Sequence, residues 1–360
     1  MTFEPLDCES IKDGNISQLC ERLESLSESP LNNQDWPAEP LKLLEQADVY
    51  RWFIPHQLGG LEWRPAKITS AYVKLASACL TTTFILTQRV AALRRICTSD
   101  NIALRDKLLK EILAGKAHAT VGISHLTTSR RHLGQPACRA IEKDGGYFVT
   151  GQTPWVTGAC GATHLVIGAE LPDGRQILFA IASQTPGITI PKGSDLIALT
   201  ASQTGPVQFE NVFVDPSWLL TDPAEQVLTV SGVTSTGSTQ TSALALGLAT
   251  SAVNFIEQES LHRPDLLDSV EALKKQQLVL EDRLLKLSSG IAICTNEELR
   301  TDMNSFVLRT TQASMAAAKG AGFVAGHPAG RWCCEALFFL VWSCPQSVIH
   351  ANLCELVGIE

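Results

Sequence analysis

The spacing of hydrophobic and polar residues predicts helices in the first part of the chain, residues 1–116. Residues 65–98 form an Ala- and Leu-rich stretch with few charges, which predicts one long buried helix. Residues 104–114 have apolar positions at helical spacing, and Gly115 ends that pattern. This part is therefore predicted to be an N-terminal helical domain.

The pattern changes in residues 117–222. Short runs rich in Val, Ile, Thr and Phe alternate with turn residues such as Asp144-Gly145-Gly146. These runs predict strands at residues 147–151, 163–171, 176–182, 187–190 and 206–214. We expect them to form a central, antiparallel, β-barrel-like domain.

Helical spacing returns in residues 223–360. Residues 244–256 are small and apolar on all sides, which predicts a buried helix. In the next helix, apolar residues recur in steps of three and four, at Leu266, Val270, Leu273, Leu280, Leu284 and Leu287. With further helices expected at 300–318 and 328–356, this part predicts a C-terminal four-helix bundle. The fold class that follows is α+β.

The composition favours a globular protein with a large core. Of the 360 residues, 45% are hydrophobic and 18% are charged. The formal net charge of -8, without a basic stripe, argues against nucleic acid as a partner. The chain starts without a basic and apolar signal, and its longest apolar run, 332–344, is too short to cross a bilayer, so no membrane association is expected.

Eleven cysteines are scattered along the chain, and none of them forms a Cys-x-x-Cys pair. This distribution predicts reduced thiols, most of them buried, and neither a disulfide scaffold nor a metal site. Reduced thiols in turn predict a cytoplasmic protein.

Three motifs in this order of parts resemble the acyl-CoA dehydrogenase superfamily. Residues 52–63 (WFIPHQLGGLEW) look like the family's Pro-x-x-x-Gly-Gly-x-Gly stretch. Residues 151–169 resemble its Gly-x-Lys-x-Trp-Ile/Val-Thr strand, and residues 206–220 resemble its Val-x-Phe-x-Asp/Asn-Val-x-Val-Pro signature. The resemblance covers nearly the whole chain from about residue 40, and it implies FAD as the cofactor.

The resemblance also implies which residues contact the flavin. In the family, the Trp of the strand motif packs beside the ring, and the Thr addresses its polar edge. In this chain the corresponding residues are Trp155, Val156 and Thr157. The alternative is that Trp155 is a core aromatic residue and Thr157 an ordinary strand residue.

A second flavin contact in the family is a strand-to-loop segment, which corresponds to residues 118–134. Ile123 or Ser124 lies where the family has a Thr, and Ser129 lies where the family has the Ser that meets the diphosphate. The two residues after Ser129 are arginines, which add positive charge. A solvated basic loop is the competing interpretation.

The third set of contacts normally comes from the neighbouring subunit. Arg263, which opens a long helix, and the loop with Gly320 and Gly322 resemble residues that clamp the adenine and pyrophosphate end. Gln346 matches a Gln that supports the ribityl or adenine side. The resemblance therefore implies a homodimer or homotetramer.

The chain departs from the family at the catalytic base. Most members carry a Glu in a Tyr-Glu-Gly-Thr-x-Gln stretch, which removes the α-proton of an acyl thioester while hydride leaves to the flavin. The corresponding residues 341–346 read VWSCPQ, so Trp342 or Ser343 replaces the Glu. Some members place the base at the start of the helix after the β-domain, but residues 237–241 (GSTQT) contain no carboxylate either.

Four other residues are bases by type. Glu335 would share a helix face with Trp342, but seven residues separate them by about 10 Å along the axis. Glu355 is farther away, Cys344 is more typical of a buried apolar position, and a lone His such as His350 is more often structural. The catalytic residues therefore stay unassigned.

Two interpretations of the function follow. One is an FAD-dependent oxidoreductase that acts on an acyl thioester, of CoA or a carrier protein, or on another small apolar substrate. The other is the superfamily's monooxygenase branch, which uses reduced flavin and O₂ and needs no α-proton base; Ser124, His125 and Ser343 are candidates there. A homologue that binds FAD or an acyl ligand without catalysis is the alternative from another class.

Overall fold

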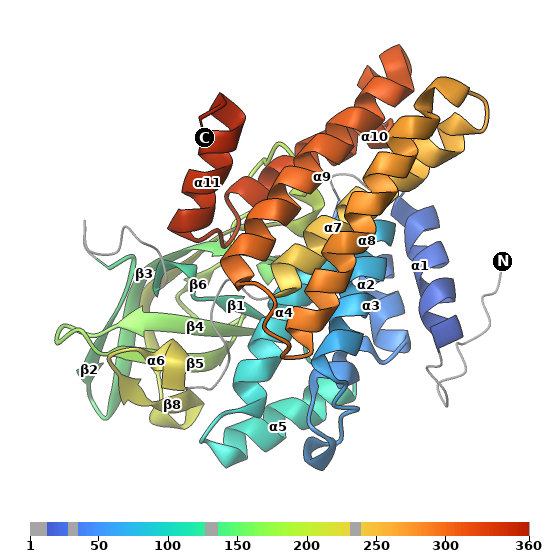
Figure 1. The fold of residues 1–360 in the computed structure, drawn as a ribbon. Helices are drawn as coiled ribbons and strands as arrows, with labels where there is room; N and C mark the ends of the chain where they lie inside the picture. The colour runs from blue at the N-terminus through green and yellow to red at the C-terminus, as the bar shows by residue number, and fades with distance from the viewer. Residues whose placement is uncertain (1–12, 28–34, 127–135, 231–238, 360) are drawn as a thin grey trace.

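The computed structural model describes residues 13–27, 35–126, 136–230 and 239–359. Figure 1 shows a β-sheet on one side of the molecule and helices from both ends of the chain packed together on the other. The predicted order of helices, a mostly antiparallel sheet and helices again is confirmed.

The described N-terminal residues form five α-helices and two short 3-10 turns before the sheet. They are α1 (Asp13–Ser27), α2 (Ala38–Gln46), η2 (Val49–Phe53), η3 (His56–Leu58), α3 (Pro65–Ala78), α4 (Leu80–Cys97) and α5 (Ile102–Leu113). The prediction of one helix over 65–98 is wrong. Cys79 is extended, with φ -158° and ψ 104°, and its N–H closes α3 while its carbonyl accepts the first bond of α4.

The motif at residues 52–63 forms a closed turn. The rings of Trp52 and Trp63 stack with centroids 4.1 Å apart and planes at 8°. A Cβ on Gly60 would lie 1.9 Å from the carbonyl oxygen of Ile54, so only glycine fits there. This motif therefore serves the packing of the N-terminal helices.

Eight strands form one sheet. They are β1 (Ala119–Gly122), β2 (Cys138–Lys143), β3 (Gly146–Val156), β4 (His164–Glu170), β5 (Gln176–Ala182), β6 (Ile188–Thr189), β7 (Gly205–Val214) and β8 (Leu219–Ala224). Their order is β6-β7-β3-β2-β4-β5-β8, and β1 pairs in parallel with β4. The five predicted strands are confirmed, whereas β2 and β8 were missed because charged residues and Pro223 interrupt their apolar positions.

The C-terminal residues return to helices. They are α6 (Val227–Val230), α7 (Thr239–Ser260), η9 (Pro264–Leu266), α8 (Leu267–Ser288), α9 (Asn296–Ala318), η10 (Lys319–Phe323), α10 (Pro328–Ala336), η11 (Leu337–Leu340) and α11 (Gln346–Val357). The single helix predicted over 328–356 is wrong, because the chain leaves helical geometry at Val341 and has φ +47° at Ser343. Glu335 and Trp342 therefore do not share a helix face.

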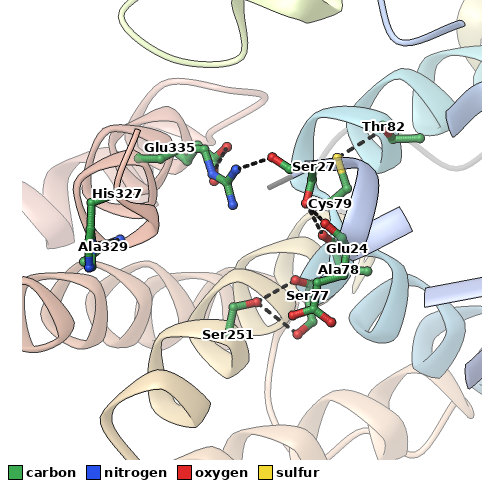
Figure 2. A network of polar contacts seen from close by, with 11 residues as sticks. Glu24, Ser27, Ser77, Ala78, Cys79, Thr82, Ser251, His327, Ala329 and Glu335 are labelled. Atoms are coloured by element: carbon green, nitrogen blue, oxygen red, sulfur yellow. Dashed lines mark hydrogen bonds and ion pairs between the residues drawn. The ribbon is translucent and has the colours of Figure 1, made fainter. Parts of the chain in front are cut away.

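The helices α3 and α7 join the two helical parts. A Cβ on Gly247 of α7 would lie 2.5 Å from the carbonyl oxygen of Val73 and 2.7 Å from Cβ of Ala76. Nearby, Oγ of Ser251 donates to the carbonyl oxygen of Ser77 at 2.6 Å (Figure 2). One apolar core runs through both parts as a result. Within the described ranges, no helix is both long and apolar enough to pass through a bilayer.

Replacing Gly247 tests this contact. Gly247→Ala is expected to lower the free energy of unfolding by about 2 kcal/mol, because the added methyl group clashes with the α3 main chain. Helix propensity alone would favour Ala by up to about 1 kcal/mol. Urea unfolding measures the difference, and Gly320→Ala, where a Cβ meets nothing within 4 Å, is the control. A more stable Gly247→Ala protein would contradict the packing.

Candidate functional site

The ends of β1 and β3 lie against each other. A Cβ on Gly122 would lie 2.7 Å from Cδ1 of Ile167 and 3.0 Å from Cγ2 of Val156. Glycine allows this close approach of two main chains. The predicted flavin contacts at residues 123–124 and 155–157 follow directly from these strand ends, so the fold brings the two segments together.

The three residues of the β3 motif differ in exposure. The side chain of Trp155 is 55% exposed, whereas Val156 is fully buried and Thr157 is 4% exposed. An exposed indole presents a flat apolar face to a ring of similar shape. Val156 belongs to the core of the β-domain, and the whole residue is buried.

Hydroxyl groups hold Thr157 in place. Its Oγ1 lies 2.9 Å from Oγ1 of Thr204, which lies 2.8 Å from Oγ of Ser202. The carbonyl oxygen of Thr157 accepts a hydrogen bond from Oγ1 of Thr120 at 2.7 Å. A hydroxyl can make more than one hydrogen bond, so Thr157 keeps the capacity to address a second group.

The β1 motif continues into η4 (Ser124–Leu126). Ile123 and Ser124 are half-buried, and His125 is buried. Nε2 of His125 lies 2.9 Å from the carbonyl oxygen of Gly168, and since a carbonyl only accepts, the imidazole donates. His125 therefore ties η4 to β4.

Some predicted positions lie outside the described residues. They are Ser129, with the two arginines that follow it, and Gly237 and Ser238 at the alternative position of the base.

An aromatic cluster surrounds Trp342, one of the two residues that the resemblance aligns with the missing Glu. The rings of Trp342 and Phe338 stack with centroids 5.0 Å apart and planes at 10°. The ring of Phe84, from α4, meets Trp342 edge-on at 5.0 Å and Phe338 edge-on at 4.9 Å. Stacked and edge-to-face pairs are the favoured geometries of aromatic rings. The indole of Trp342 is thus packed on both neighbours, and Ser343, the other residue that the resemblance aligns with the Glu, is half-buried beside it.

Helix α9 holds the main chain of this segment. Nη2 of Arg300 donates to the carbonyl oxygens of Phe339 and Trp342 at 3.0 and 3.2 Å. Nδ2 of Asn304 donates to the carbonyl oxygen of Phe339 at 3.1 Å. Arg300 is 2% exposed, and burial lowers the pKa of its guanidinium to about 10. The sequence showed Arg300 only as the start of a helix, because its partners lie about 40 residues later in the chain.

Glu335 lies in a different environment from Trp342. Figure 2 shows it beside Ser27 and Cys79, at the end of α1 and the junction of α3 with α4. Nε of Arg331 lies 3.7 Å from its carboxylate, and Nη1 of Arg331 donates to the carbonyl oxygen of Ser27 at 2.9 Å. Burial raises the pKa of Glu335 to about 7, and Arg331 opposes that rise.

The remaining base candidates lie on or just before α11. Glu355 is exposed and accepts a hydrogen bond from Oγ of Ser305. His350 is exposed, and its Nε2 lies 3.8 Å from Sγ of Cys354. Cys344 is half-buried, and burial raises the pKa of its thiol. Neither Glu355 nor His350 has the dry surroundings that tune a catalytic base.

The third predicted set lies apart from the sheet. Nη1 of Arg263 donates to the carbonyl oxygen of Ala317 at 2.6 Å, which places it against the end of α9. Gly322 is buried in η10, and Gly320 faces open space. Figure 1 shows α10, which follows this loop, at the end of the bundle away from the sheet. Gln346, the first residue of α11, is exposed.

A polar cluster that no motif predicted lines a cleft between the N-terminal helices and β1. Oε1 of Glu45 lies 3.2 Å from Nη1 of Arg89 and 3.4 Å from Nδ1 of His118. Arg89 also donates to the hydroxyl of Tyr50 at 3.1 Å. Burial, and then the charge of Arg89, lower the pKa of His118. These charges pair with one another, so the cluster ties helix α2 to the start of the sheet.

The described cysteines are free thiols. Only Cys138 among them is buried, and Cys160 and Cys334 are exposed, so the prediction that most are buried is wrong. The other described cysteines are partly exposed. No group of three or more His, Cys, Asp or Glu side chains in the described part of the chain is placed to hold a metal ion.

Comparison with known proteins identifies relatives of two kinds, although no protein-family model matches the chain. The chain is 24% identical over 184 residues to a probable acyl-CoA dehydrogenase, YngJ, of Bacillus subtilis, which covers 50% of this chain and 48% of that protein. It is 27% identical over 165 residues to the oxygenase component of p-hydroxyphenylacetate 3-hydroxylase of Acinetobacter baumannii, covering 45% and 36%. The matched segments thus span about half or less of these relatives.

Solved structures match over the whole chain. Butyryl-CoA dehydrogenase of Megasphaera elsdenii has a TM-score of 0.78 at 16% identity and covers 99% of this chain and 100% of that one. Dibenzothiophene monooxygenase of Paenibacillus sp. A11-2 has a TM-score of 0.75 at 15% identity, with 95% and 96% covered. A further structure of that enzyme holds FMN and indole. The chain has the fold of the acyl-CoA dehydrogenase superfamily, which confirms the resemblance seen in its motifs.

The buried carboxyl of Glu335 predicts a pH-dependent stability. Its folded-state pKa of about 7 exceeds the ordinary value of 4.5, so folding favours the protonated form. The protein therefore loses stability as pH rises from 4.5 through 7, by about 3 kcal/mol in total. Glu335→Gln is expected to be more stable than the original protein at pH 8 by about this amount, and nearly equal to it at pH 4.

Urea unfolding across this pH range measures the effect. The same charge change on the exposed residue Glu142 of β2 is the control, with an expected effect within about 0.5 kcal/mol. A Glu335→Gln protein that shows no gain between pH 4 and pH 8 would contradict the raised pKa.

Proposed function

We propose that this chain is a flavin-dependent oxidoreductase of the monooxygenase type, which uses reduced flavin and O₂ on a small apolar substrate. The observation that carries the proposal is the packing of Trp342 against Phe84 and Phe338 at the position of the dehydrogenase Glu. A general base must lie within hydrogen-bond reach of the proton that it removes. An indole ring takes up no proton, whereas oxygen chemistry on a reduced flavin needs no α-proton base.

The rigidity of this segment supports the proposal. Arg300 and Asn304 hold the carbonyl groups on both sides of the Trp342 turn from a buried position. A carboxylate elsewhere in the chain would have to displace this packed segment to reach the same point. Glu335 is separated from it by the break between α10 and α11, and its carboxyl faces α1.

A flavin fits the residues at the ends of β1 and β3. The exposed indole of Trp155 offers a flat surface, and the half-buried Ile123 and Ser124 lie at the end of the neighbouring strand, where they would meet a ring edge. When bound there, the flavin supplies two-electron redox chemistry. The protein's own part is to orient the ring and to exclude water from the aromatic side.

FAD is the proposed form of the flavin, and a homodimer or homotetramer is the proposed assembly. Arg263, Gly320 and Gly322 resemble the clamp for adenine and pyrophosphate, and they lie together at the end of the bundle away from the sheet. A second copy of the chain would bring that set to the flavin of the first. Arg263→Ala is therefore expected to weaken FAD binding more than FMN binding, since only FAD carries the adenine end.

The apolar ring surface also indicates the substrate class. Phe84, Phe338 and Trp342 pack as a cluster of three aromatic side chains, of which Phe338 and Trp342 are partly exposed and Phe84 is buried. Such a cluster suits a small planar apolar molecule. Oxidation of an acyl thioester, of CoA or a carrier protein, is the second candidate, and the match to a probable acyl-CoA dehydrogenase favours it.

Two arms of one experiment separate these functions. The purified protein is loaded with FAD or FMN and titrated without oxygen with short, medium and long acyl-CoAs, while the visible flavin absorbance is followed. We expect no bleaching. The flavin is then reduced chemically and mixed with O₂ and planar apolar substrates, and we expect an oxygenated product by mass spectrometry. Bleaching by any acyl-CoA would overturn the proposal in favour of the dehydrogenase.

The flavin site itself is tested at Trp155. Trp155→Ala is expected to weaken flavin binding about fivefold or more, because a stacking surface worth about 1 kcal/mol or more is lost. Phe213→Ala removes another exposed aromatic side chain of the same domain and is expected to leave the affinity unchanged. Flavin fluorescence titration measures both, and equal affinities for the two variants would contradict the site.

A further inference from the structure

Arg300 is a buried cation with an incomplete set of acceptors. Both of its hydrogen bonds to the 337–345 segment come from Nη2. Its Nε and Nη1 are buried and have no hydrogen-bond partner among the described residues. A buried charge without a counter-ion and a buried N–H without an acceptor both destabilise the folded protein. The site is therefore short of an anion.

Cys344 is the ionisable group that this cation influences. It lies two residues after Trp342, whose carbonyl oxygen binds Arg300, and its Sγ lies 4.0 Å from Nδ2 of Asn304. Oδ1 of Asn304 is also buried without a partner in the described part of the chain. Burial raises the pKa of the Cys344 thiol, and the charge of Arg300 opposes that rise. The thiol is half-buried, so a small reagent can reach it.

We propose that Cys344 is an oxidation site, at which hydrogen peroxide converts the thiol to a sulfinate that becomes the counter-ion of Arg300. In the first step the peroxide O–O bond breaks, one oxygen bonds to sulfur, and the other leaves as water, which gives the sulfenic acid. A second peroxide repeats this to the sulfinic acid, and each step takes two electrons from sulfur. The sulfinic proton passes to solvent, and its oxygens accept hydrogen bonds from the guanidinium.

The rate of this oxidation depends on the fraction of Cys344 that is present as thiolate. Because the thiolate is the reactive form, the raised pKa of Cys344 makes oxidation slow at neutral pH and faster as pH rises. The sulfinate differs from the thiol in charge. It carries a full negative charge at neutral pH, and so supplies the counter-ion that Arg300 lacks in the reduced protein. The oxidised state is therefore favoured by its surroundings more than the reduced state.

Cys294 offers a matched comparison within the same bundle. Its thiol interacts with Arg283, but Arg283 already forms an ion pair with the carboxylate of Asp302. A negative charge at Cys294 would gain little, because its arginine has a counter-ion. Cys294 thus reports how an arginine that is already paired affects a negative charge at a cysteine. Cys344 reports the effect of an arginine that lacks acceptors.

Substitution tests the electrostatic part without any oxidant. Cys344→Asp places a fixed carboxylate at the site, and Cys344→Asn has nearly the same shape without charge. At pH 7 the unfolding equilibrium constant of Cys344→Asp is expected to be about tenfold lower than that of Cys344→Asn. The pair Cys294→Asp and Cys294→Asn is expected to show no such gap. A Cys344→Asp protein that is no more stable than Cys344→Asn overturns the proposal.

Peroxide treatment of the purified full chain tests the modification itself. After incubation at pH 8, peptide mass spectrometry is expected to show the gain of two oxygen atoms at Cys344, and the oxidised protein is expected to unfold at higher urea concentration. In Arg300→Met this stabilisation is expected to be absent. If that variant does not fold, the comparison of Cys344→Asp with Cys344→Asn still tests the proposal. Oxidation of the exposed Cys160 and Cys334 with Cys344 left reduced would overturn the proposal. None of these outcomes depends on a bound flavin, so they are separate from the proposed function.

Discussion

The buried guanidinium of Arg300 holds the segment between α10 and α11 in place, and the proposed chemistry of this protein depends on that segment. Arg300 binds the carbonyl oxygens of Phe339 and Trp342, and these bonds hold the chain between α10 and α11 in a single path. That path directs the indole of Trp342 onto Phe338 and Phe84, and so joins α9, η11 and α4. In the proposed alignment, a packed aromatic residue thereby stands where most acyl-CoA dehydrogenases carry a proton-abstracting Glu, and the proposed use of O₂ follows from that replacement.

The proposed flavin site depends on a different feature, the close approach of β1 and β3. Gly122 leaves room for the side chains of Ile167 and Val156 where β1 meets β3, which brings residues 123–124 and the exposed Trp155 to the same end of these strands. Arg263, one of the residues that resemble the adenine clamp, bonds the end of α9, and the other two, Gly320 and Gly322, follow directly in η10. In the proposed assembly a complete cofactor site requires two copies of the chain, while the aromatic cluster belongs to one copy.

Much of this architecture could be predicted from the spacing of apolar residues, and the failures have physical reasons. The missed break at Cys79 lies in a stretch of small residues without Gly or Pro, so the sequence carries no sign of that single extended residue. The break at Ser343 lies two residues before Pro345, a signal that the apolar spacing on both sides obscured. The absence of a carboxylate at Trp342 was visible in the sequence. Its partner Phe84 was not, because that contact joins residues far apart in the chain and only the packing of α4 against η11 creates it.

Deuterium exchange at the α-carbon of an acyl-CoA tests the central claim most directly. It reports a base within reach of the α-proton, whether or not a hydride is transferred. The flavin-loaded protein is incubated with acyl-CoA in deuterated buffer, and the substrate is examined by mass spectrometry, with the protein-free solution as the reference. The aromatic replacement of the Glu predicts the same exchange rate with and without protein. Exchange that is clearly faster with protein would show a working base and contradict the account.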